Sequence, residues 1–131
     1  MKTIEEIKKI ADSCLNCKNK PCMEKGCPVK TNIPEFIEKI KKDDYKKAYE
    51  ILVENNIFSY ACSIICPREE QCEGSCIRGI KQEATKIGEL EKFINEWALE
   101  NKFDINIKQK EKNGKKVAVI GSRTSWFGMC I

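Results

Sequence analysis

The sequence predicts a mostly α-helical fold built around two cysteine-rich loops, with a single short strand near the C-terminus. Two observations predict the helices and the loops: apolar residues recur at helical spacing in four segments, and eight of the nine cysteines fall into two groups. The third observation is the run KVAVIG at residues 116–121, which is apolar and ends in glycine, as a short buried strand would. With 131 residues the chain has room for one domain and an appendage.

Each predicted helix has a start signal and an apolar face. The first covers residues 3–12, the second follows a cap at Thr31 or Asn32, the third follows a cap at Asp43 or Asp44, and the last begins at Thr85. Their inward-facing residues are Ile4, Ile7 and Ile10; Phe36, Ile37 and Ile40; Tyr45, Ala48, Leu52 and Val53; and Leu90, Phe93, Ile94 and Trp97. Residues 14–28 and 62–76 are predicted loops. Because such short helices bury little apolar surface, we expect metal binding to supply further stability.

Charge and hydropathy exclude several classes of protein. The formal net charge of +4 comes from lysines and glutamates that are interspersed along the chain, so no concentrated basic patch indicates nucleic-acid binding. No apolar run approaches the roughly 20 residues that a membrane-spanning helix needs, and the N-terminus lacks the apolar segment of a secretion signal. We therefore expect a cytoplasmic protein without nucleic-acid or membrane partners.

The counts of cysteine and histidine point to a metal site. The chain has nine cysteines and no histidine. Thiols stay reduced in the cytosol, where grouped cysteines are more typical of metal sites than of disulfides. The absence of histidine from the sequence excludes Cys/His zinc fingers, Rieske centres, histidine-ligated haem and histidine-based acid–base catalysis.

The spacing of the cysteines favours iron–sulfur clusters. The groups CLNCKNKPCMEKGCP and CSIICPREEQCEGSC hold four cysteines each, and each four-iron cluster needs about four protein ligands. The eight are Cys14, Cys17, Cys22 and Cys27 in the first group and Cys62, Cys66, Cys72 and Cys76 in the second. Two four-cysteine zinc sites would use the same donors, but zinc ribbons usually carry paired C-x2-C knuckles, and only Cys14 and Cys17 form one. A disulfide framework conflicts with the compartment, and inert buried cysteines would not be grouped.

A proline directly follows Cys27 and Cys66. In bacterial ferredoxins the cysteine before such a proline binds the other cluster of the pair. We therefore expect the two loops to exchange ligands, so that neither loop holds a cluster by itself.

The motif order resembles that of a known family over the run from Cys14 to Trp97. The motifs are C-x2-C-x4-C-x4-C-P, then C-x3-C-P, then C-x3-C, then IGELEKF at residues 87–93. In this order they resemble the N-terminal iron–sulfur domain of the glutamate synthase small chain. The same domain occurs in dihydropyrimidine dehydrogenase and in an electron-bifurcating NADH-dependent ferredoxin:NADP oxidoreductase. The resemblance implies an α-helical ferredoxin-like fold with two 4Fe-4S clusters.

The resemblance also implies which residues bind each cluster. One cluster would take Cys14, Cys17, Cys22 and Cys76. The second would take Cys27, Cys66, Cys72 and Glu91, whose position carries Gln or Glu in the family. Cys62 then has no ligand role. The residues alone select all eight cysteines and leave Glu91 as an ordinary solvated helix residue.

Three segments are expected along the chain. Residues 1–100 form the two-cluster domain, residues 101–115 form a polar linker, and residues 116–131 are the remnant of a Rossmann-like FAD-binding domain. In the family, KVAVIG continues into GSGPAGL, the glycine loop that receives the FAD pyrophosphate. Here it continues into GSRTSWFGMCI, so only Gly121 of that loop is in place and Arg123 occupies the position of the second glycine. We therefore do not expect FAD or NADPH to bind this chain.

The C-terminal tail has a simple explanation in the reading frame. Codons for residues 123–131 can be chosen so that loss of one base after Ser122 gives GPAGLECA, which completes the family sequence. We expect a frameshifted tail, in which Cys130 is an adventitious thiol and not a ligand. A natural divergent tail is the alternative.

The resemblance implies an oxidoreductase domain that passes single electrons between FAD and a partner subunit. In intact relatives NADPH reduces the FAD, and the partner is a large subunit or a flavoprotein domain. The truncated chain alone is expected to carry electrons and not to oxidise NADPH. A free-standing ferredoxin-like carrier and a zinc-stabilised interaction module are the alternatives.

Overall fold

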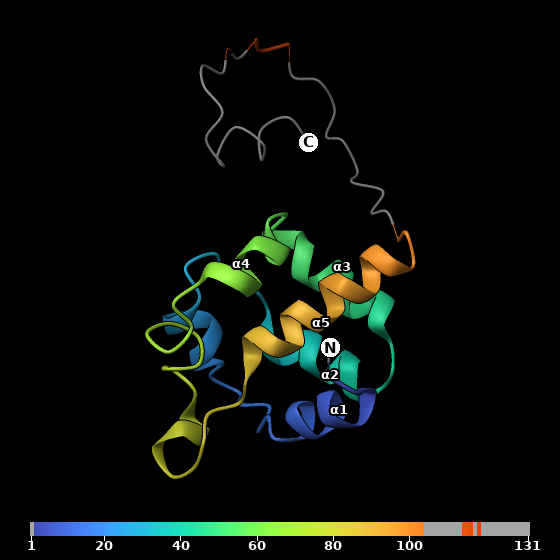
Figure 1. The fold of residues 1–131 in the computed structure, drawn as a ribbon. Helices are drawn as coiled ribbons and strands as arrows, with labels where there is room; N and C mark the ends of the chain where they lie inside the picture. Colours follow the sequence, from blue (N-terminus) through green and yellow to red (C-terminus); the bar gives the residue numbers. More distant parts are fainter. Residues whose placement is uncertain (1, 104–113, 117, 119–131) are drawn as a thin grey trace.

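The computed structural model describes residues 2–103, 114–116 and 118, and within them every element is helical (Figure 1). The elements in chain order are α1 Ile4–Asp12, a π-helical turn η1 Cys22–Gly26, α2 Ile33–Lys41, α3 Tyr45–Asn55, α4 Ser59–Ile65, a 3₁₀ turn η2 Ile77–Ile80 and α5 Ile87–Glu100. The cysteine-rich segments between them gather on one side of the helices, the left in Figure 1. No helix in the described part of the chain is long and apolar enough to span a membrane.

The core lies between α2, α3 and α5, with α1 packed against α2 and α5. Its fully buried large side chains come from four helices; they are Ile7, Phe36, Ile37, Ile40, Leu52, Leu90 and Ile94. All of these were predicted to face inward. Tyr45, Phe93 and Trp97 are only partly buried and meet edge to face at the border of the core. In α3 the helical face is turned slightly from the prediction, since Ile51 is buried and Val53 is only half-buried.

The helix starts show which capping predictions hold. Thr3 caps α1 in a capping box: its hydroxyl accepts from the Glu6 N–H at 3.3 Å, and the Glu6 carboxylate accepts from the Thr3 N–H at 2.8 Å. Asp44 caps α3 by accepting from the Lys47 N–H at 3.1 Å. Asn32 precedes α2 but makes no capping bond, because its side-chain oxygen accepts from Lys20 Nζ at 3.0 Å.

Two boundaries differ from the prediction. The predicted loop at residues 62–76 begins inside α4, a seven-residue helix too short to show a clear apolar period but packed along α5. The last helix begins at Ile87 and not at Thr85. Thr85 is buried, and its hydroxyl accepts a hydrogen bond from the Ser13 hydroxyl at 3.1 Å, so it ties the chain to the end of α1 instead.

The C-terminal predictions fall largely outside the described residues. Of the predicted strand at residues 116–121, only residues 116 and 118 are described, and Gly121 is not. The strand, the linker and the tail therefore stay predictions.

The two cysteine-rich segments touch backbone to backbone at Gly26. A Cβ atom on Gly26 would lie 2.7 Å from Cys72 Cα and 2.7 Å from the Gln71 carbonyl oxygen, closer than a real side chain can approach. Only glycine therefore lets the first segment pass this close to the second.

We predict that Gly26→Ala destabilises the protein, because its methyl group would force two backbone segments apart. The cost should be about 1–3 kcal/mol, the usual range for overpacking. Urea unfolding of anaerobically prepared protein, followed by far-UV circular dichroism, measures it. Gly79→Ala is the matched control, since a Cβ there meets its nearest atom, Ala84 Cβ, at 3.5 Å. Equal urea midpoints for the two variants would contradict the predicted cost.

Candidate metal centres

Two cavities beside the helical core are each lined by cysteines from both cysteine-rich segments, and a wider, more open cavity is lined by Cys66 and Cys76. The first has a volume of about 20 Å³ and is lined by all four residues implied for one cluster: Cys14, Cys17, Cys22 and Cys76. The second has a volume of about 170 Å³ and is lined by the four implied for the other cluster: Cys27, Cys66, Cys72 and Glu91. Cys62 lines this second cavity as well. The structure thus groups the donors across the two segments and not within each of them.

The elements explain this grouping. Cys14 and Cys17 follow α1, Cys22 opens η1, and Cys76 reaches the first cavity from the residue before η2. Cys27 follows η1 directly and faces the second cavity. The turn η1, which begins at Cys22 and ends one residue before Cys27, therefore directs two thiols of one segment into different cavities.

Both sets of side chains consist mainly of thiols, which bind iron–sulfur clusters, but the two cavities differ in volume. Thiolates are the usual ligands of four-iron clusters, and a carboxylate is a harder donor that would change the potential of the cluster it binds. The second cavity has space for a group of several atoms, whereas the thiols around the first must rotate outward to admit one. In the described part of the chain no three Cys, Asp or Glu side chains stand close enough together to share one metal ion. Ligation by these residues therefore stays a prediction.

Two isoleucines form the wall between the cavities. Ile33 and Ile87 line both cavities, and each is 3% exposed. They are the first residues of α2 and α5, so the N-terminal ends of these helices lie next to both donor sets. A helix N-terminus carries partial positive charge and stabilises anionic groups, which suits thiolate-ligated clusters.

Burial perturbs the thiols. It is the main reason that the pKa of Cys22 rises to about 11 and that of Cys72 to about 12, with the nearby carboxylates of Glu73 and Glu91 adding to the rise at Cys72. The pKa of Cys66 rises to about 11, first through burial and then through the neighbouring Cys62 thiol. Without metal these thiols stay protonated at neutral pH. Metal binding must therefore release their protons.

Glu91 is a half-buried carboxylate that is held by a series of hydrogen bonds. Burial raises its pKa to about 7, while the Ser59 hydroxyl and the charge of Arg68 act in the opposite direction. Ser59 Oγ donates to Glu91 Oε1 at 2.9 Å, and Asn95 Nδ2 donates to Ser59 Oγ at 2.9 Å and to the Glu91 carbonyl oxygen at 2.8 Å. Ser59 and Asn95 are buried. These hydrogen bonds hold one carboxylate oxygen, Oε1, and Glu91 lines the second cavity.

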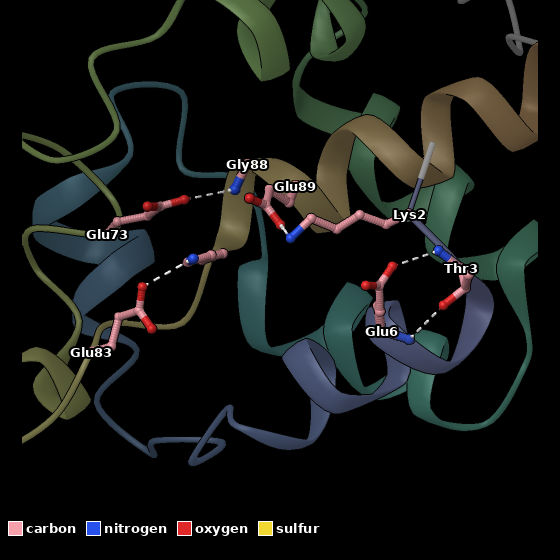
Figure 2. A network of polar contacts seen from close by, with 8 residues as sticks. Lys2, Thr3, Glu6, Glu73, Glu83, Gly88 and Glu89 are labelled. Carbon is pink, nitrogen blue, oxygen red and sulfur yellow. Dashed lines mark hydrogen bonds and ion pairs between the residues drawn. The ribbon is translucent and has the colours of Figure 1, made fainter.

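The start of α5 is held by the second cysteine-rich segment. Its N-cap residue, Lys86, makes no capping bond; instead the Glu73 carboxylate accepts from the Gly88 N–H at 2.9 Å (Figure 2). The Arg68 side chain lies against Gly88 so closely that a Cβ there would be 2.0 Å from Arg68 Cδ. These contacts join the segment that carries Cys66 and Cys72 to the helix that carries Glu91.

Comparison with known proteins identifies the domain. Residues 1–103 match the family described as dihydropyrimidine dehydrogenase domain II, 4Fe-4S cluster. The chain belongs to this 4Fe-4S domain family. The glutamate synthase [NADPH] small chain of Escherichia coli K12 is 35% identical over 112 residues, 86% of this chain and 24% of that protein. The NAD-dependent dihydropyrimidine dehydrogenase subunit PreT of the same organism is 32% identical over 114 residues, 87% of this chain and 27% of that protein. This chain therefore spans about a quarter of the length of these relatives.

Several side chains of the 4Fe-4S domain that line the second cavity or support Glu91 are not evident from the sequence. Ser59, Asn95 and Arg68 were not singled out, and Cys62 was set aside as having no ligand role. The spacing of Asn95 four residues after Glu91 on one helix was an available signal. Ser59 offered none, since it lies 32 residues from the carboxylate that it contacts.

We predict that Ser59→Ala weakens the 4Fe-4S domain around Glu91. It leaves a carboxylate oxygen of Glu91 and the buried Asn95 amide each short of one partner, at a cost of about 1–3 kcal/mol. Anaerobic thermal unfolding, with visible absorbance following the loss of iron, measures the effect. Ser63→Ala is the matched control, because this buried serine of the same helix donates only to the Tyr60 carbonyl oxygen, at 2.7 Å. Unchanged thermal stability in Ser59→Ala would show that the hydrogen bonds from Asn95 to Ser59 and from Ser59 to Glu91 do not stabilise this region.

Proposed function

We propose that this chain is an electron-carrying domain with two 4Fe-4S clusters, of the type found in glutamate synthase small chains. It would pass single electrons between FAD and a partner subunit of an NAD(P)H-dependent oxidoreductase. The single observation that carries the proposal is the pair of cavities, each lined by donors from both cysteine-rich segments. The family and the relatives named above, a glutamate synthase chain and a dihydropyrimidine dehydrogenase subunit, supply the oxidoreductase context.

In this proposal the chain's residues bind, separate and shield the clusters. Cys14, Cys17, Cys22 and Cys76 bind one cluster, and Cys27, Cys66, Cys72 and Glu91 bind the other. A bound 4Fe-4S cluster accepts and releases one electron at a time. Ile33 and Ile87 are buried apolar side chains that line both sites, so they exclude water from the space between the clusters. Because the same two residues touch both sites, the clusters would be neighbours.

The two sites differ in the charges of the side chains that lie next to them. Near the first, Lys41 Nζ donates to the Cys14 carbonyl oxygen at 3.2 Å, which brings a positive charge to that ligand. Near the second, the Glu73 carboxylate adds negative charge beside Cys72, and Arg68 lines the cavity. Because nearby charge is one of the factors that tune cluster potential, the two sites should differ in potential.

In this proposal, hydride transfer from the nicotinamide to FAD takes place on other domains of the oxidoreductase. The match to the family ends at residue 103, and the chain spans about a quarter of its relatives. We infer that FAD and the nicotinamide bind other domains, and that a large subunit or flavoprotein domain exchanges electrons with this one. Purified chain should therefore show no NADPH–acceptor activity.

We predict that anaerobic reconstitution loads about eight irons and eight sulfides per chain and turns the protein brown. Iron, sulfide and zinc are counted on the same sample, beside visible absorbance. A colourless preparation with about two zinc ions per chain would instead identify a zinc-stabilised module.

We predict a distinctive pattern of iron loss from paired ligand substitutions. Cys17→Ala with Cys76→Ala should remove one cluster and leave about four irons, because both residues are assigned to the same site. Cys17→Ala with Cys72→Ala should remove both clusters. If each cysteine-rich segment held its own cluster, both pairs would lose all the iron, and the interleaved assignment would be wrong.

A further inference from the structure

The second cavity has one more potential ligand than a four-iron cluster requires. Four donors are assigned to it under the proposed function, and Cys62 lines the same cavity without an assigned role. Since each iron of a cubane cluster takes about one protein ligand, one of the five donors must be left over.

The end of α4 brings Cys62 and Cys66 to the same cavity. Cys62 lies within α4, Cys66 is the extended C-cap residue that follows the helix, and both side chains line the second cavity. The Cys66 N–H donates to the Cys62 carbonyl oxygen at 3.1 Å, which closes the last turn of the helix. Any group bound by Cys66 is therefore adjacent to Cys62.

A buried amide holds the Cys62 sulfur in position. Asn56 Nδ2 donates to Cys62 Sγ at 3.2 Å, and Asn56 Oδ1 accepts from the Phe58 N–H at 3.1 Å. Asn56 is 8% exposed and lines the cavity with Cys62. A sulfur that merely filled space would not need this orientation. Ser59 likewise holds the Glu91 carboxylate, and Asn95 supports Ser59.

We propose that Cys62 is a second ligand for the iron that Glu91 binds, so that this cluster has a carboxylate-bound and an all-thiolate state. The proposal rests on the proposed function. In the exchange the iron–oxygen bond to Glu91 breaks and an iron–sulfur bond to Cys62 forms. The proton leaves the Cys62 thiol and is taken up by the released carboxylate or by water, and the oxidation state of the cluster does not change. Glu91 is the resident ligand, since two side chains support it.

Four variants of the full chain test the exchange. Glu91→Leu removes the carboxylate but keeps its approximate volume, so that the site stays filled. Cys62→Ala removes the thiol, and the double variant removes both. Glu96→Leu is the matched control, because Glu96 lies on the same helix outside the cavity, where it pairs with Lys92 at 3.7 Å. Far-UV circular dichroism checks that each variant folds.

Two measurements on the reconstituted proteins decide the outcome. Wild type, the control and both single variants should bind about eight irons, whereas the double variant should lose at least the fourth iron of the second site. Electron paramagnetic resonance should then detect a three-iron cluster in the oxidised double variant, or no cluster in this site. Anaerobic iodoacetamide labelling with peptide mapping reports on Cys62 directly: it should react in folded wild type and be protected in Glu91→Leu.

Three results would overturn the exchange while leaving the proposed function intact. The first is a Glu91→Leu variant that loses the fourth iron as the double variant does. The second is a double variant that keeps about eight irons. The third is equal labelling of Cys62 in wild type and Glu91→Leu. Failure of the proposed function looks different, since wild type itself would then fail to bind iron.

Discussion

The arrangement of both cavities depends on one constraint, the close contact between the two cysteine-rich segments. Gly26 passes so near Cys72 that no side chain fits between them, and Cys27 follows immediately. This contact brings the thiol after η1 into a cavity whose other donors come from later in the chain. The cavities exist because the segments cross here, and each donor set is complete only when both are in place. Folding of the segments and binding of metal should therefore be strongly coupled.

Helix α5 connects this crossing to the helical core. Its buried face supplies Leu90 and Ile94 to the core, and the same helix carries Glu91 to the second cavity. A buried carboxylate is costly unless it is hydrogen-bonded or neutralised. Ser59 and Asn95 satisfy part of that need, and a bound metal would satisfy the remainder. The helix is thus placed by the apolar packing of its buried face, by the hydrogen bond from the Gly88 N–H to Glu73, and by the close approach of the Arg68 side chain to Gly88.

Much of this architecture could be predicted from sequence, for identifiable reasons. The long helices were visible because Phe36, Ile37 and Ile40, for example, recur at a regular helical period. Helix α4 was missed because seven residues give too little periodicity, and Thr85 was misjudged because its hydroxyl bonds to Ser13 and not to its own helix. The Cys-Pro pattern predicted that each cluster takes ligands from both segments, but the residues alone did not say which cysteines belong to which cluster. Glu91 entered through family resemblance only, since nothing local distinguishes it from an exposed glutamate. Its partner Ser59 belongs to a different helix, and such contacts depend on tertiary packing.

The arrangement also explains why so small a core suffices. Ile33 and Ile87 belong both to the helical core and to the walls of the two cavities, so the same side chains support packing and metal sites. Thiols whose pKa is raised by burial are neutral without metal, and this avoids the cost of buried charge in the empty protein. When metal binds, it replaces those protons and neutralises the thiolates in the same step. Under the proposed function, metal–ligand bonds would add to the cohesion between the two segments, so that the main task of the core would be to orient the donors.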